Sequence, residues 1–263
     1  MTSLWINSHV NTPADLPLGQ YYDTLITVGT PIKTALVYLV VVTLWSSFNK
    51  KSKVKPSPSG SGLKAFVVLH NALLMAFSFL SFYHSAGVLS RVFTDEGSFK
   101  DRFCDTGRPL WAAGFFYWGW LFYLSKYYEM IDTAIILIKG RTPSFLQTYH
   151  HAGAIIGMWY LVQASSPGLW IFLTLNSFIH TIMYNYYIFA TLGYNLPGKK
   201  YITYMQITQF IVGSTIAFGY LLTPNCATPQ QLYSIAFNLS YVAPLIYLFT
   251  KFAQASYSKQ KEA

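Results

Sequence analysis

Ionisable side chains recur at helical spacing inside a stretch of chain that is otherwise apolar. In the segment KYYEMIDT (126–133), Lys126, Glu129 and Asp132 follow one another every three residues. Residues three and four apart share one face of an α-helix, so these charges form a stripe. Charged groups within a membrane-spanning helix normally face the protein interior or a water-filled cavity, and they indicate a functional site by default. The alternative is a structural ion pair between Lys126 and Glu129 that fixes helix packing.

Histidines and amides form matching stripes on the apolar stretches that follow. Gln147, His150 and His151 stand at positions i, i+3 and i+4. The next two stretches add polar side chains at the same spacing, namely Asn176, His180, Tyr184, Tyr187, Thr203, Gln206 and Gln209. Imidazoles act as nucleophiles, as general acids or bases, or as metal ligands. So many polar groups in one layer favour chemistry, whereas we interpret His70 and His84, on an earlier stretch, as structural.

Metal binding and transport are the alternatives to metal-free catalysis. His150, His151 and His180 have the ligand types for one zinc ion, but no acid adjoins the histidine pair. A di-iron centre needs more histidines than the six in the chain. We therefore predict no metal. A retinal protein needs a lysine in its last span, and residues 230–250 contain none. A transporter or receptor with a polar pathway stays open as an alternative.

The elements that position these groups are predicted membrane spans. Hydrophobic residues make up 53% of the 263 residues and charged residues 10%, whereas soluble domains carry about 25% charged residues. A spanning helix needs about 20 mainly apolar residues. Seven stretches qualify: 27–48, 65–89, 110–138, 146–164, 169–191, 202–222 and 230–250. We expect an all-α integral membrane protein with a single domain over residues 1–263.

Orientation follows from the distribution of basic residues. With the N-terminus outside, twelve lie on the cytosolic side: Lys50, Lys51, Lys53, Lys55, Lys64, Lys139, Arg141, Lys199, Lys200, Lys251, Lys259 and Lys261. Arg91, Lys100, Arg102 and Arg108 lie opposite. Cytosolic loops carry the excess of Lys and Arg, which also explains the net charge of +9 without nucleic acid as a partner. We predict an outer or lumenal segment 1–26 and a cytosolic tail 251–263.

Four segments in this order resemble the signature boxes of the ELO family of fatty acid elongases: KYYEMIDT, QTYHH, HTIMYNYY and TYMQITQ. The family pattern around the histidine pair is HxxHH, and here Gln147 takes the first position. That departure resembles the elongases that act on polyunsaturated chains. The resemblance implies condensation of a long-chain acyl-CoA with malonyl-CoA, which yields a 3-oxoacyl-CoA two carbons longer and releases CO2 and CoA.

The resemblance also implies roles for residues and partners. His150 would carry the acyl group, or act as a base in a direct condensation, with His151 and His180 assisting. The other polar residues of the stripes, from Lys126 to Gln209, would position the histidines or the substrates. Lys139, Arg141, Lys199 and Lys200 are candidates for the CoA phosphates, although the positive-inside bias explains them equally. No cofactor is expected. The expected partners are the bilayer, the two CoA esters, the reductases and dehydratase of the elongation cycle, and a second copy of the chain. We expect helices 2–7 to enclose a substrate tunnel.

Two further predictions concern location in the endoplasmic reticulum. Cys104 and Cys226 both fall on the side opposite the cytosol, where an oxidising lumen lets a disulfide persist. We predict a bridge between them, the alternative being two unrelated small apolar residues. Lys259 and Lys261, fifth and third from the end of the sequence, resemble a dilysine retrieval signal. Positive charge after the last span is the alternative explanation.

Overall fold

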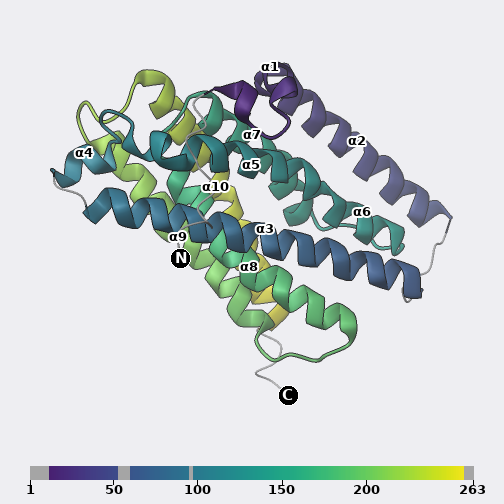
Figure 1. The fold of residues 1–263 in the computed structure, drawn as a ribbon. Coiled ribbons are helices and arrows are strands. Elements are labelled where there is room, and N and C mark those ends of the chain that lie inside the picture. Colours follow the sequence, from purple (N-terminus) through teal and green to yellow (C-terminus); the bar gives the residue numbers. More distant parts are fainter. Residues whose placement is uncertain (1–11, 53–59, 95–96, 258–263) are drawn as a thin grey trace.

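The computed structural model describes residues 12–52, 60–94 and 97–257, and this part of the chain is helical without any strand (Figure 1). Its principal helices are α2 (Gly29–Lys51), α3 (Ser61–Thr94), α5 (Phe116–Tyr128), α6 (Met130–Ile138), α7 (Phe145–Gln163), α8 (Leu169–Leu192), α9 (Lys199–Leu222) and α10 (Pro229–Tyr257). Shorter elements are η1 (Pro13–Asp15), η2 (Gly19–Tyr21), α1 (Tyr22–Ile26), α4 (Phe99–Phe103) and the π-helical turn η3 (Trp111–Phe115).

Each of the seven predicted stretches is helical, but the third is divided. Residues 110–138 form η3, α5 and α6 instead of one helix. Gly114 has a φ of 138°, which is unfavourable for residues with a side chain, and it breaks the helix there. A second break falls at Glu129, where the Asp132 amide bonds back only three residues to the Glu129 carbonyl. This tighter turn places Glu129 at the junction of α5 and α6.

Local signals set several of the helix ends. The Ser144 hydroxyl accepts a hydrogen bond from the Gln147 amide at 3.1 Å and caps the start of α7. Gly193 adopts a left-handed conformation with φ 105° and ends α8. Ser98 caps the short helix α4 in the same way as Ser144 caps α7.

Six of the helical segments form a closed ring of neighbours. Going round it, α3 packs against α8, α8 against α9, α9 against α10, and α10 against α7. The α5–α6 segment packs against α7, and α5 completes the ring by contacting α3. Helix α2 lies outside this ring, against α6 and α7 (Figure 1).

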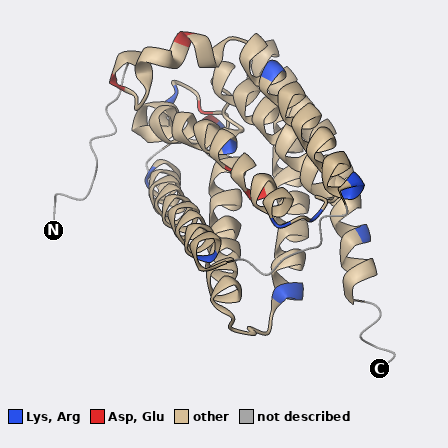
Figure 2. Cartoon of the chain, turned by 90° about the vertical axis from the view of Figure 1, so that its right-hand side faces the viewer, with Lys and Arg blue, Asp and Glu red and all other residues tan. Residues whose placement is uncertain are grey.

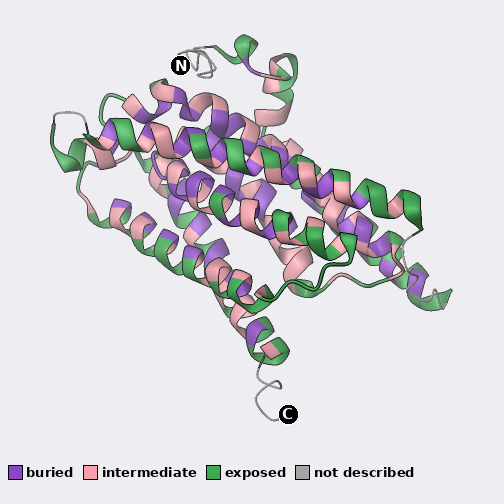
Figure 3. Cartoon of the chain, turned by 60° about the horizontal axis from the view of Figure 1, so that its bottom comes forward, coloured by how far each residue is buried: buried purple, intermediate pink, exposed green. Residues whose placement is uncertain are grey.

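Four of the described helices, α2, α3, α9 and α10, are long and apolar enough to cross a membrane. The outward faces of the bundle carry large apolar side chains, while the buried residues face inward (Figure 3). On α2, Leu36, Val40 and Leu44 are 57%, 57% and 65% exposed. A water-soluble protein rarely exposes so continuous an apolar face, which suits contact with lipid instead.

The interior has two different ends. Cys104 and Cys226 are joined by a disulfide at one end, within a buried apolar cluster that includes Trp111 and Tyr220. At the other end the ring encloses a polar cavity. Basic side chains lie mainly near helix ends, and acidic ones are few (Figure 2). The packed apolar core therefore closes one end of the ring and leaves the other hollow.

Candidate active site

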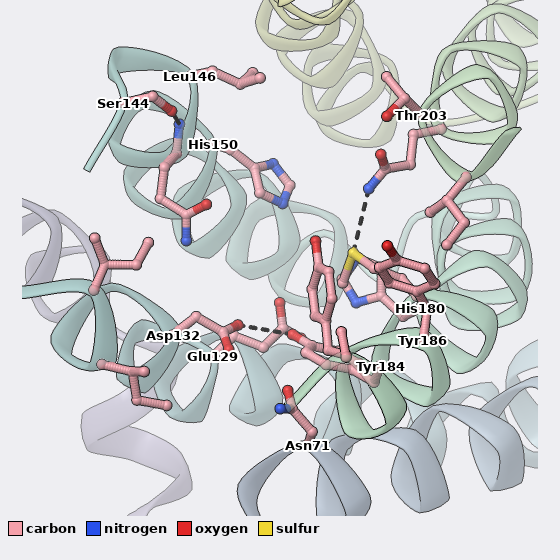
Figure 4. A pocket seen from close by; sticks show the side chains of 18 of the residues that line it. Asn71, Glu129, Asp132, Ser144, Leu146, His150, His180, Tyr184, Tyr186 and Thr203 are labelled. Carbon is pink, nitrogen blue, oxygen red and sulfur yellow. Dashed lines mark hydrogen bonds between the residues drawn. The ribbon is translucent and has the colours of Figure 1, made fainter. Parts of the chain in front are cut away.

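The polar cavity has a volume of about 720 Å³ and contains most of the residues singled out from the sequence (Figure 4). Those that line it are Glu129, Asp132, Gln147, His150, His151, Asn176, His180, Tyr184, Tyr187, Gln206 and Gln209. They come from the α5–α6 junction, α6, α7, α8 and α9. Thr203 on α9 and Asn71 on α3 also line the cavity.

His150 of α7 lines the cavity, and Tyr241 of α10 contacts its ring nitrogen Nδ1. The Tyr241 hydroxyl donates its proton to the His150 carbonyl at 2.8 Å. The same hydroxyl lies 3.1 Å from His150 Nδ1 and must therefore accept the hydrogen bond there. Nδ1 thus carries the proton, and Nε2 keeps its lone pair. This arrangement gives a neutral imidazole with a free nucleophilic or basic nitrogen.

Small residues on α7 allow Tyr241 to come this close. A Cβ atom at Gly153 would overlap the Tyr241 ring. One turn further along, a Cβ at Gly157 would lie 2.6 Å from Asn238 Oδ1, while Asn238 Nδ2 donates to the Gly157 carbonyl. The Gly153–Gly157 pair therefore brings α7 and α10 together and sets the tyrosine beside His150.

The neighbouring histidine is oriented by the residue that replaces the first histidine of the family box. The Gln147 side-chain amide lies 2.8 Å from His151 Nε2 and 3.4 Å from the Thr133 hydroxyl, which accepts. Because an amide nitrogen can only donate, His151 Nε2 accepts and its proton lies on Nδ1. Tyr38 of α2 bonds to the same Thr133 hydroxyl at 2.9 Å. Gln147 thus fixes the tautomer of His151.

His180 is linked to a buried ion pair. Asn176 Nδ2 donates to His180 Nε2 at 3.1 Å, and Asn176 Oδ1 accepts from Lys126 Nζ at 3.3 Å. Lys126 also pairs with Glu129 at 2.7 Å, and both residues are buried. The ion pair that we considered as the structural alternative therefore exists, and it extends through Asn176 to a histidine. An ion pair of this kind is strongly sensitive to loss of either partner.

A second, narrower cavity of about 50 Å³ adjoins the first. The two cavities share His150, Asn176, Gln209 and Phe210. The second is otherwise lined mainly by apolar side chains, including Phe122, Met158, Ile171, Leu175 and Leu245, with Lys126 at its polar side. Lys126 therefore lies beside the narrow cavity and not on the wall of the larger one. The two spaces therefore differ in character, since many polar side chains line the larger one and mainly apolar side chains line the smaller one.

Four basic residues line the polar cavity. Three of them, Lys139, Arg141 and Lys199, are candidates for the CoA phosphates, and the fourth is Lys64 of α3. Lys200 does not line it, because its ammonium lies 5.1 Å from the centre of the Tyr201 ring. Burial, and next the nearby Arg141 charge, lower the pKa of Lys139. An anion bound beside Lys139 would offset both effects.

His70, interpreted from the sequence as structural, is buried and does not itself line the cavity. Its Nε2 lies 2.9 Å from Oδ1 of Asp132, which does line the cavity. His84, on the same helix, stacks on Trp118 with ring centroids 4.6 Å apart and does not line the cavity. The predicted retrieval residues Lys259 and Lys261 lie outside the described residues. Tyr241 was missed because one tyrosine among 21 gives no signal.

Comparison with known proteins places the chain in a family. Residues 24–263 match the ELO family, described as the GNS1/SUR4 family. "Fatty acid elongase sre1" of Dictyostelium discoideum is 31% identical over 234 residues, which cover 86% of this chain and 83% of the relative. "Long chain fatty acid elongase 2" of Caenorhabditis elegans is 28% identical over 250 residues, covering 91% and 88%. "Very long chain fatty acid elongase 2" of Rattus norvegicus is 34% identical over 148 residues, covering 54% and 52%. The chain therefore belongs to the ELO family of fatty acid elongases.

Proposed function

We propose that the protein condenses a long-chain acyl-CoA with malonyl-CoA to give a 3-oxoacyl-CoA two carbons longer. The observation that carries the proposal is the placement of His150. Its free Nε2 faces the polar cavity, and the residue is shared with the apolar cavity that adjoins it. A thioester held there would have its acyl chain in apolar surroundings and its CoA portion towards the basic residues. Family membership independently supports a role in fatty acid elongation.

The first half of the proposed reaction transfers the acyl group to the protein. His150 Nε2 attacks the thioester carbonyl carbon, the carbon–sulfur bond breaks, and CoA leaves as a thiolate that takes up a proton. Tyr241 holds the Nδ1 proton and stabilises the positive charge that develops on the ring. Lys126 and Asn176 line the narrow cavity together with His150, and they would stabilise the negative charge that develops on the carbonyl oxygen. The product of this step is an acyl-imidazolium that is acylated on Nε2 and keeps its proton on Nδ1.

The second half releases the product. Malonyl-CoA loses CO2, and the electrons of the broken carbon–carbon bond form an enolate that attacks the acyl carbon. The bond from that carbon to His150 Nε2 then breaks, which restores the neutral histidine. His151 and His180 serve as proton-transfer or hydrogen-bonding groups for the thioester oxygen and the malonyl carboxylate. Decarboxylation supplies the carbon nucleophile, so the reaction requires no cofactor.

The proposed setting is the membrane of the endoplasmic reticulum. The seven helical stretches would cross it with the N-terminus lumenal and the C-terminus cytosolic, so that the basic residues at the cavity meet cytosolic CoA esters. The disulfide would then lie at the lumenal end. A 3-oxoacyl-CoA must next be reduced and dehydrated, and the enzymes of those steps are the expected partners. A second copy of the chain is a further expected partner.

We propose a polyunsaturated chain as the substrate. Gln147 in place of the first histidine supports this choice by its resemblance to elongases of that kind. Yeast expressing the protein should be fed a matched panel of saturated, monounsaturated and polyunsaturated fatty acids, and the elongated products measured. Products from saturated chains alone would refute the substrate class while leaving the condensation itself intact.

The covalent step is tested by intact-protein mass spectrometry. Purified protein incubated with acyl-CoA alone should gain the mass of the acyl group, and His150→Ala should gain none. Malonyl-CoA added afterwards should remove the adduct and release 3-oxoacyl-CoA. Normal turnover without an adduct would replace this scheme by direct condensation with His150 as a base. If neither an adduct nor a condensation product forms, the proposed function is wrong, and a polar pathway for transport becomes the reading to test.

A further inference from the structure

A buried histidine on α3 is tied to the wall of the cavity. The His70 side chain is fully buried, and its Nε2 lies 2.9 Å from Asp132 Oδ1. The ring also packs against Tyr128, with centroids 5.1 Å apart, and stacks near Phe66. The contact joins residues 62 positions apart and links α3 to α6 through side chains. Asp132 is the hydrogen-bond partner of Nε2, whereas Nδ1 is buried without a partner among the described residues. Because burying a polar group without a partner is costly, the Asp132 contact is the one that can hold the His70 ring in place.

Asp132 passes this contact on to a third helix. Its other oxygen, Oδ2, accepts a hydrogen bond from the Tyr184 hydroxyl of α8 at 2.9 Å (Figure 4). The Tyr184 ring in turn stands edge-on to His180, with centroids 5.4 Å apart and planes at 87°. His70, Asp132, Tyr184 and His180 therefore form a continuous series of contacts that ends at a histidine of the cavity.

One end of this series of contacts is buried and the other lines the cavity, which distinguishes it from a purely structural ion pair. His70 is at the buried end, whereas the Asp132 side chain keeps 19% of its surface exposed, and Asp132, Tyr184 and His180 all line the cavity. An apolar residue at position 70 would satisfy packing against Tyr128 equally well. It would, however, leave the Asp132 carboxylate held, among the described side chains, by the Tyr184 hydroxyl alone. A buried donor behind Asp132 fixes that carboxylate in one orientation.

We propose that His70 is a positioning residue of this site. It fixes Asp132, and through Asp132 it fixes Tyr184 against the ring of His180. His70 itself touches no substrate in this arrangement. The inference rests on the proposed condensation reaction, because its effect is measured on that reaction.

Two substitutions at position 70 separate the hydrogen bond from the packing. His70→Phe keeps an aromatic ring against Tyr128 but removes the donor, whereas His70→Gln keeps a donor at similar reach. We expect His70→Phe to lower kcat by about 10-fold to 100-fold, as misplacement of a catalytic group does, with KM for malonyl-CoA nearly unchanged. We expect His70→Gln to restore most of the lost rate. Unchanged kcat in folded His70→Phe overturns the proposal.

A double-mutant comparison tests the route through Tyr184. If His70 acts through the Tyr184 hydroxyl, His70→Phe should lower kcat much less in a Tyr184→Phe background than in the wild type. If the double variant instead loses kcat by the product of the two single fold-reductions, and His70→Gln does not restore the rate, His70 has a merely structural role. If His70→Phe does not accumulate as folded protein, His70→Gln is compared with wild type in both backgrounds. In that case the proposal is overturned if His70→Gln lowers kcat, relative to the wild type, as much as Tyr184→Phe does.

His84→Phe is the matched control. It also replaces a buried histidine of α3 that packs against an aromatic ring, but it lies 14 residues from His70 and off the cavity. We expect kcat of His84→Phe to equal that of the wild type. The two proposals fail differently. If the wild type forms no 3-oxoacyl-CoA, the proposed function is wrong, whereas normal wild-type turnover with an insensitive position 70 removes only this inference.

Discussion

Tyr241 donates to the backbone carbonyl of His150 and accepts from the same residue's imidazole, so one hydroxyl fixes both the main chain and the tautomer of that histidine. Removing it frees the His150 proton to move to Nε2 and lets the ring rotate. We expect Tyr241→Phe to slow acyl-adduct formation by about 10²-fold, as small misplacements of reacting groups do. Pre-steady-state mass spectrometry of the adduct measures this rate.

The control for this prediction lies on the same helix. Tyr233 of α10 is 66% exposed, and Tyr233→Phe removes a hydroxyl without touching α7. It should leave the rate of adduct formation unchanged. Equal rates in wild type and Tyr241→Phe would show that the tautomer of His150 is set by something else.

The basic residues around the cavity make a neighbour-by-neighbour test of CoA binding possible. Lys199 lines the cavity, whereas the next residue, Lys200, lies over the Tyr201 ring. We expect Lys199→Glu to raise the KM for malonyl-CoA and Lys200→Glu to leave it near the wild-type value. The KM effect of Lys199→Glu should shrink as salt is added, since salt screens exposed charges. Equal KM values for the two variants would leave these lysines with the topological role alone.

A larger side chain in place of Gly213 of α9 is predicted to shorten the acyl chains that the protein prefers. Gly213 lines the narrow cavity, and a Cβ there would lie 3.2 Å from Ile171 and 3.6 Å from Leu175. Leucine at this position adds four carbon atoms to that space, so Gly213→Leu should prefer substrates roughly two to four carbons shorter. Competition between acyl-CoA esters of different length measures the shift. Val212→Leu, at a 43% exposed neighbour, should keep the wild-type preference.

Much of the site could be predicted because helix geometry fixes which residues share a face. The stripes that contain Glu129, His150 and His180 needed only their spacing, and the cavity contains all three. The histidine at position 70 could not be placed, because its partner is 62 residues away in the sequence. The sequence also did not separate Lys199, which lines the cavity, from Lys200, which does not. Adjacent residues on a helix point in different directions, and the charge pattern does not show which of the two faces inward.

The fold was predictable to a similar depth. A long apolar run indicates a helix but does not show where it is interrupted, so 110–138 was expected as one element. The breaks at Gly114 and Glu129 depend on tertiary contacts and on one positive φ. The contact between α5 and α3 that closes the ring could not be predicted from the hydrophobic pattern either. In a membrane protein, apolar residues face both the lipid and the neighbouring helices, so the pattern does not tell which helices are neighbours.

Asp105 gives a prediction on pH. It lies in the loop before η3, where its carboxylate accepts from the Leu110 amide at 2.7 Å, and burial raises its pKa to about 6. The folded protein therefore binds a proton more tightly than the unfolded chain does. Unfolding free energy should fall as pH rises from about 4 to about 6, and it should then level off as far as this group is concerned.

The variant Asp105→Asn isolates that contribution. Asparagine keeps the acceptor for Leu110 and tolerates the φ of 54° at this position. We expect its Tm to exceed that of the wild type at pH 7 by on the order of 2–4 °C, and the difference to shrink towards pH 4. A difference that grows as the pH falls would show that the charged form is favoured by the fold.

The disulfide should contribute to stability because it closes a long loop. Cys104 and Cys226 are 122 positions apart. A crosslink of this kind stabilises by about 2–4 kcal/mol. We expect reductant to lower the Tm of the wild type in detergent and to leave the Cys104→Ala/Cys226→Ala double variant unaffected. If both thiols label with maleimide before reduction, the bridge is absent from the isolated protein.

The basic residues of the polar cavity bear on the order of events in the proposed reaction. The cavity has a volume of about 720 Å³, and Lys64, Lys139, Arg141 and Lys199 all line it. If both CoA esters bind through these residues, they compete for the same site. In the proposed two-step scheme the acyl group is transferred to His150, and its CoA leaves, before malonyl-CoA binds there. Malonyl-CoA that binds to protein without an acyl group on His150 would block the binding of acyl-CoA. Excess malonyl-CoA should therefore inhibit the reaction in which it is a substrate.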